Sequence, residues 1–108
     1  EGDITEFHFA EDSVAVVCSD NAVSSENKVF LMDSEGQLIQ SKTINGKVNK
    51  VCCDKSAVYV LRDESIVRIS ADGSEKSVSC GTSVEDIVVL YGNLLKCEKL
   101  GTSSVKFE

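Results

Sequence analysis

Short runs of apolar residues alternate with polar turns along the whole chain. Val14–Cys18, Val29–Met32 and Ala57–Leu61 are such runs, rich in β-branched side chains and each followed by turn-forming residues. Strands separated by turns at intervals of about 8 to 12 residues are typical of all-β proteins. No stretch maintains the period of about 3.6 residues that a helix requires. The pattern therefore predicts an all-β fold.

The apolar positions also recur along the chain. Val51 lies 44 residues after Phe7 and 36 residues before Ile87, and all three occupy equivalent positions in similar runs. Recurrence at this spacing predicts copies of one structural unit. The expected strands are Ile4–Ala10, Val14–Cys18, Lys28–Met32, Gln37–Ile44, Lys47–Cys53, Ala57–Leu61, Ile66–Ser70, Ser74–Cys80, Val84–Leu90, Asn93–Cys97 and Ser104–Phe107. They divide one domain, residues 1–108, into copies at about 3–45, 46–82 and 83–108, the last one strand short.

The strands within each unit differ in polarity. Val14–Cys18 and Ala57–Leu61 are almost wholly apolar, which is typical of strands covered on both faces. The fourth strands, Gln37–Ile44 and Ser74–Cys80, are more polar and suit an outer, solvated rim. This gradient is typical of the blades of a β-propeller. The predicted fold is about three four-stranded antiparallel blades, the last incomplete, forming part or half of a propeller.

The chain resembles the blades of bacterial β-propellers of the PQQ-like and YVTN-like kinds. The pattern is carried by Val48, Val51, Val58–Leu61, the strand Ile66–Ile69 and the turn Ala71–Gly73. The resemblance implies an interaction scaffold within a larger propeller, and an extracytoplasmic part of an anchored bacterial protein. Blades of PQQ-dependent dehydrogenases carry a tryptophan, which this chain lacks, so no quinone and no other cofactor is expected.

Three blades are too few to close a ring. Propellers close with about 4 to 8 blades, so an open stack leaves one apolar face bare at each end. At several hundred Å² per face and about 25 cal/mol/Å², the unburied area corresponds to roughly 10 kcal/mol. We therefore expect one of two arrangements. Either the parent chain supplies the missing blades, or the chain self-associates so that two copies related by a two-fold axis form one ring.

The charge balance argues against nucleic acid as a partner. The chain has 11 basic and 18 acidic residues, a net charge of −7, and no basic patch with interleaved aromatic residues. Such a chain repels phosphate backbones, and its acidity is interpreted as a solvated surface. No apolar run reaches the roughly 20 residues of a membrane helix, so this segment is expected to make no membrane contact.

The five cysteines do not have the spacing of a disulfide framework. They are Cys18, Cys52, Cys53, Cys80 and Cys97, and each lies in or beside an apolar run. They are interpreted as reduced, buried residues, which also fits a cytoplasmic location, while a single disulfide between adjacent copies stays open. Cys52 and Cys53 are expected to point to opposite faces of one strand.

No motif for catalysis or metal binding stands out. Asp33–Gly36 and Ser70–Gly73 lack the further oxygen ligands of a calcium loop, and they are interpreted as hairpin turns with a glycine at positive φ. His8 is the only histidine, and no motif places a nucleophile beside it. The sequence therefore predicts no catalytic residue and no metal ligand.

Two functions are open. The first is a non-catalytic scaffold that binds a protein or polymer through its longest polar loop. The candidate contacts in that loop are Ser19, Asp20, Asn21, Ser24, Ser25, Glu26 and Asn27. The alternative is an enzyme with its active site in the central funnel of the assembled propeller. Polar residues on the innermost strands would line that funnel, namely Thr5, Glu6, His8, Asn49, Lys50, Glu85 and Asp86.

Overall fold

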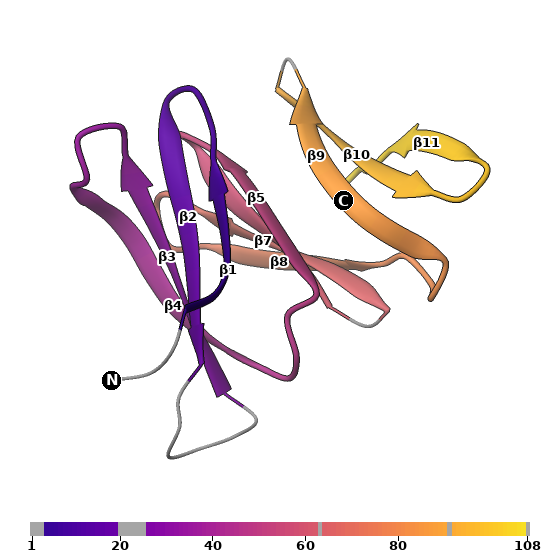
Figure 1. Ribbon diagram of the computed structural model, residues 1–108, viewed down its shortest axis with the longest axis horizontal. Coiled ribbons are helices and arrows are strands. Elements are labelled where there is room, and N and C mark those ends of the chain that lie inside the picture. Colours follow the sequence, from indigo (N-terminus) through magenta and orange to yellow (C-terminus); the bar gives the residue numbers. More distant parts are fainter. Residues whose placement is uncertain (1–3, 20–25, 63, 91, 108) are drawn as a thin grey trace.

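The computed structural model describes residues 4–19, 26–62, 64–90 and 92–107 of the chain. These residues form eleven β-strands in three antiparallel sheets, which confirms the all-β prediction (Figure 1). None of the described segments forms a helix able to cross a membrane.

Each sheet is built from strands that follow one another in the chain. The first sheet contains β1 (Ile4–Phe9), β2 (Ser13–Ser19), β3 (Glu26–Asp33) and β4 (Leu38–Asn45) in that order. The second contains β5 (Lys50–Asp54), β6 (Ala57–Leu61), β7 (Ser65–Ser70) and β8 (Glu75–Ser79). The third contains β9 (Val84–Leu90), β10 (Asn93–Glu98) and β11 (Gly101–Ser104). The expected sheets of four, four and three strands are confirmed.

The two acidic turns are hairpin turns, as the sequence predicted. The Asp33 carboxylate accepts two backbone N–H bonds of 2.9 Å inside its turn, and Gly36 has a φ of +86°. In the corresponding turn of the second sheet, Gly73 has a φ of +93°, and Asp72 accepts bonds from the backbone N–H and the hydroxyl of Ser74. These bonds to Ser74 lower the pKa of Asp72. Both carboxylates therefore stabilise the turn backbone.

The three sheets lie face to face in chain order. Strands β1 and β2 contact β5, and β5 and β6 contact β9. Figure 1 shows the first sheet on the left, the third on the right and the second between them. Because β1, β5 and β9 are each the first edge strand of their sheet, these edges adjoin one another along one side of the stack.

Two apolar layers hold the stack together. We call the face of a sheet that points toward the following sheet its front face, and the opposite face its back face. The first layer joins Ala15, Val17, Val29 and Leu31 on the front of the first sheet to Val51, Cys53, Val58, Val60, Val67 and Ile69 on the back of the second. The second layer joins Cys52, Ala57, Tyr59, Leu61 and Ile66 to Ile87 and Leu94 of the third sheet. The second sheet is therefore covered on both faces, which explains why all of β6 is buried.

Polar contacts at the margins also join the first two sheets. The Gln40 amide donates to the Ala71 carbonyl at 3.2 Å, and Lys42 Nζ lies 3.6 Å from Glu75 Oε1. Both contacts start from β4, whose central residues are half-buried. The exposed residues of β8 fit the expected solvated rim better.

Two expected strands begin three residues away from the observed ones, the largest differences from the prediction. The last strand is Gly101–Ser104 rather than Ser104–Phe107. Beyond it the Val105 N–H still donates to the Leu94 carbonyl, and the side chains of Val105 and Phe107 pack into the second layer. The Phe107 ring stacks on Tyr59 with centroids 6.0 Å apart, and the Arg68 guanidinium lies 4.9 Å from its centre. Similarly, β5 begins at Lys50 rather than Lys47, although Val48 is buried in the first layer.

Candidate functional site

The polar loop proposed as a binding site is described only at its ends. Ser19 ends β2, and Glu26 and Asn27 begin β3. Asn27 is buried, and its side-chain amide donates to the Gly46 carbonyl at 2.7 Å. Asn27 therefore ties β3 to the turn that leads into the second sheet. The other proposed contacts, Asp20, Asn21, Ser24 and Ser25, lie outside the described residues.

The residues proposed to line a funnel all lie on or beside the adjoining edge strands. Thr5, Glu6 and His8 are on β1, Asn49 and Lys50 are at the start of β5, and Glu85 and Asp86 are on β9. Lys50, Glu85 and Asp86 are exposed, while Glu6 and His8 are half-buried. In the described part of the chain, no hydrogen bond or ion pair joins two of these side chains. The structure brings them to one side of the stack without pairing an acid with a base.

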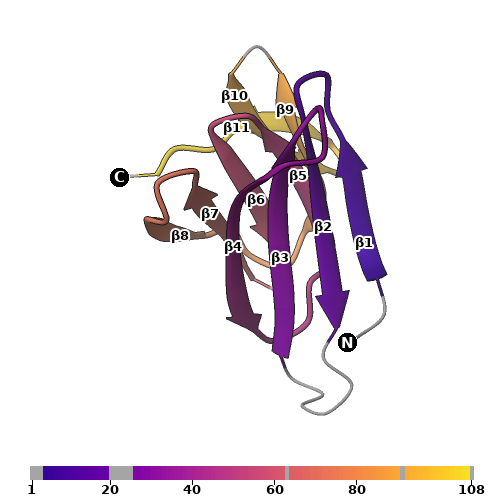
Figure 2. The same ribbon diagram turned by 90° about the vertical axis from the view of Figure 1, so that its left-hand side faces the viewer.

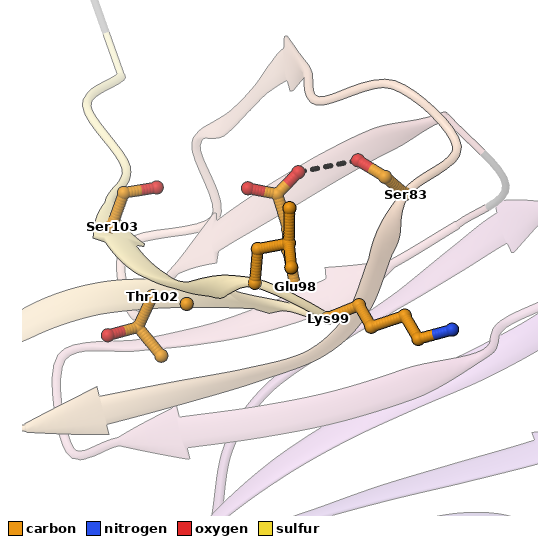
Figure 3. A pocket seen from close by; sticks show the side chains of 7 residues that line it. Ser83, Glu98, Lys99, Thr102 and Ser103 are labelled. Carbon is orange, nitrogen blue, oxygen red and sulfur yellow. Dashed lines mark hydrogen bonds between the residues drawn. The ribbon is translucent and has the colours of Figure 1, made fainter.

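An open hollow of about 700 Å³ lies beside the hairpin of β10 and β11 (Figure 3). Ser83 donates a hydrogen bond of 2.5 Å to Glu98 Oε2, and the Lys99 amino group points away from that carboxylate. The only histidine is on β1 in the first sheet, so no imidazole can act as a base for the Ser83 hydroxyl. The remaining lining residues are Leu100, Gly101, Thr102 and Ser103. This hollow does not hold the parts of a hydrolase site.

The cysteines are free thiols, and two of them are deeply buried. Cys53 lies in the first apolar layer and Cys52 in the second, which confirms that they point to opposite faces of β5. Cys53 Sγ lies 3.3 Å from the buried Ser13 hydroxyl. Burial raises the pKa of both thiols, that of Cys52 strongly. Neither forms a nucleophilic thiolate at neutral pH, and the described residues hold no group of three or more potential metal ligands.

Stability is expected to fall as the pH rises above about 9. The folded protein holds the Cys52 proton more tightly than the unfolded chain does, so unfolding releases this proton above the ordinary thiol pKa of about 8.5. Each pH unit in that range lowers the free energy of unfolding by about 1.4 kcal/mol for this group. Cys52→Ala should reduce the slope by that amount between about pH 9 and 11 in urea unfolding. Ser34→Ala, at an exposed turn, is the control, and equal slopes for Cys52→Ala and the wild type would contradict the prediction.

The back face of the first sheet is apolar and uncovered. Strand register places Phe7, Val16 and Phe30 in one row across β1, β2 and β3. Phe9, Val14 and Met32 form the next row, and Ile4, Cys18 and Leu38 extend the same face. The rings of Phe7 and Phe9 pack edge to face at 5.5 Å, yet these residues are 59% and 71% exposed. Figure 2 looks onto this face, and no other sheet lies over it.

The front face of the third sheet is the second uncovered face. Val88 and Leu95 are paired on it, and Ser104 continues the row on β11. Leu90 and Cys97 lie on the same face, and Val88 and Leu90 are 38% and 52% exposed. The sequence predicted a bare face at each end of the stack but did not identify these residues. The alternation of Phe7 and Phe9 about His8 was the signal for the first of them.

Comparison of the chain with protein-family models, with curated proteins and with solved structures gave no match. The chain's own residues and their arrangement are therefore what indicate its function.

Proposed function

We propose that this chain is part of a β-propeller of the PQQ-like or YVTN-like kind and acts as a non-catalytic scaffold that binds a protein or polymer. One observation carries the proposal. Three antiparallel sheets stack face to face with their first strands adjoining, and the stack ends in two uncovered faces that carry exposed apolar side chains. Sheets arranged radially around a common inner edge are the defining feature of propeller blades.

The apolar end faces favour binding over catalysis. Exposed apolar patches of several hundred Å² on a protein mark interaction surfaces. The back face of the first sheet carries three phenylalanines, Phe7, Phe9 and Phe30, and aromatic residues are enriched where protein surfaces meet. Such a face suits a protein surface better than a polar polymer.

The polar residues on the inner edge strands do not favour an enzyme. A general acid or base needs a second group within hydrogen-bond reach and a site that excludes water. His8 and Glu6 are half-buried on β1, and neither is joined to a described side chain of β5 or β9 by a hydrogen bond or an ion pair. Solvation of a channel accounts for these residues.

A direct test is a panel of chromogenic esters, glycosides and phosphate esters. Wild-type protein is expected to show no turnover above the buffer blank. Glu6→Gln and His8→Ala, which remove the two half-buried titratable groups of β1, should then behave as the wild type does. Turnover that either variant abolishes while its circular dichroism spectrum stays unchanged would overturn the scaffold and support an enzyme with its site at the inner edges.

A further inference from the structure

We infer that the back face of the first sheet binds the front face of the third sheet of a second copy, so that two copies close into a ring of six sheets. This inference rests on the proposed function and names the partner of the scaffold. It follows from what the two bare faces have in common with faces that are already packed inside the chain.

The bare back face is built like a face that packs against a front face. Its two rows are Phe7–Val16–Phe30 and Phe9–Val14–Met32. The same register in the second sheet gives Val51–Val60–Val67 and Cys53–Val58–Ile69. All six residues of the second sheet are buried against the front of the first sheet. The equivalent positions of the first sheet therefore present an apolar surface that lacks its neighbouring sheet.

The bare front face shows the complementary relation. Its rows are Val88–Leu95–Ser104 and Asp86–Cys97–Thr102. In the second sheet the corresponding rows are Cys52–Tyr59–Arg68 and Lys50–Leu61–Ile66. Of these, Cys52, Tyr59, Leu61 and Ile66 are buried against the third sheet. The third sheet therefore presents positions that, one sheet earlier, pack against a back face.

The two bare faces also complement one another in size. On the back face, Phe7 and Phe30 occupy positions that are valine in the second sheet, so this face is unusually bulky. On the front face, Cys97 and Ser104 occupy positions that are leucine and arginine in the second sheet, so this face is unusually small. Close packing requires that added volume on one surface be matched by room on the other. In a dimer, the bulky back face of one copy would meet the small front face of the other.

A second copy also covers both bare faces at once. Each copy has one bare back face and one bare front face, so a two-fold axis generates the same back-to-front contact twice and leaves no end uncovered. With strands about 4.8 Å apart and about 3.4 Å per residue, each three- or four-stranded face covers roughly 300 to 400 Å². Two such contacts bury roughly 1,200 to 1,600 Å² in total, within the range of stable protein interfaces.

The test is sedimentation equilibrium of the full chain from about 1 to 100 μM, in about 150 mM salt so that repulsion between the acidic copies is screened. Wild-type protein should have twice the chain mass of 11.6 kDa. Phe7→Lys and Val88→Glu each place one charge on one bare face and should each raise the dimer dissociation constant at least thirtyfold. Both residues are exposed in the single chain, so both variants should keep the wild-type circular dichroism spectrum.

Mixing the two variants distinguishes the proposed contact from other dimers. In a mixed dimer, one contact places lysine opposite glutamate and the other contact is wild type, so the mixture should dimerise at least tenfold more tightly than either variant alone. Ser34→Lys, at an exposed turn, is the matched control and should dimerise normally. A dimer broken by Phe7→Lys but not by Val88→Glu would indicate back-to-back pairing and overturn the inference.

The outcomes also separate this inference from the proposed function. A wild-type chain that stays monomeric over the whole range would overturn the second copy as partner and leave further sheets of a longer chain to cover the faces. A monomeric chain that shows no enzymatic turnover would still be consistent with the scaffold function. If the wild-type protein is a dimer and shows turnover that Glu6→Gln abolishes, the scaffold function is overturned while the inferred dimer is not.

Discussion

Val60→Asp is expected to abolish cooperative folding of the chain. Val60 is 0% exposed on β6, where it is paired with Val51 and Val67 and packed against the first sheet. An unpaired carboxylate in such a position costs several kcal/mol, and the whole stability of a domain is about 5 to 15 kcal/mol. Heteronuclear NMR should show loss of the dispersed amide signals of a folded β protein.

Thr43→Asp is the control for this experiment. Thr43 is exposed on β4, so the same carboxylate stays solvated there and only the weak preference of strands against aspartate remains, less than about 1 kcal/mol. A Val60→Asp variant that unfolds cooperatively, with a stability within about 1 kcal/mol of the wild type, would show that β6 is not enclosed between two sheets.

Leu31→Ala is expected to lower the free energy of unfolding by about 2 to 5 kcal/mol. Leu31 is fully buried on the front of the first sheet, and its side chain fills space against the second sheet. Removing it loses the transfer free energy of the side chain and leaves a cavity that neighbouring strands, fixed by their hydrogen bonds, cannot close. Urea unfolding at one protein concentration is the measurement, because self-association makes apparent stability depend on concentration.

Leu100→Ala is the matched control, since it makes the same chemical change at a fully exposed position between β10 and β11. Its effect should stay within about 0.5 kcal/mol. Equal losses for the two variants would contradict the assignment of Leu31 to the interface between sheets.

The sequence predicted some strands with exact boundaries and others only approximately. Ala57–Leu61 and Val84–Leu90 have the predicted boundaries, since apolar runs between turn residues leave little choice of register. The prediction of Ser104–Phe107 as a strand was wrong, because an apolar residue is attracted to any apolar layer, whether or not its backbone pairs. Phe107 satisfies that attraction by stacking on Tyr59.

The candidate sites were less predictable than the strands. Asn27 looked like part of a polar loop, but its amide is used to bond the Gly46 carbonyl. Glu6, His8 and Asp86 lie on the adjoining edge strands β1 and β9, but their distances and partners depend on how the sheets stack. Polarity alone does not distinguish a ligand contact from a structural bond.

The sequence by itself determined the approximate positions of the strands, their division into sheets of four, four and three, and the acidic hairpin turns. These features depend on side-chain periodicity and on local backbone preferences, and both are set by a few neighbouring residues. Only the tertiary structure decided which face of each strand is covered, and so which residues of the end sheets are bare. The face that carries Phe7, Phe9 and Phe30 is as apolar as a buried sheet face. Only the presence or absence of a neighbouring sheet distinguishes the two.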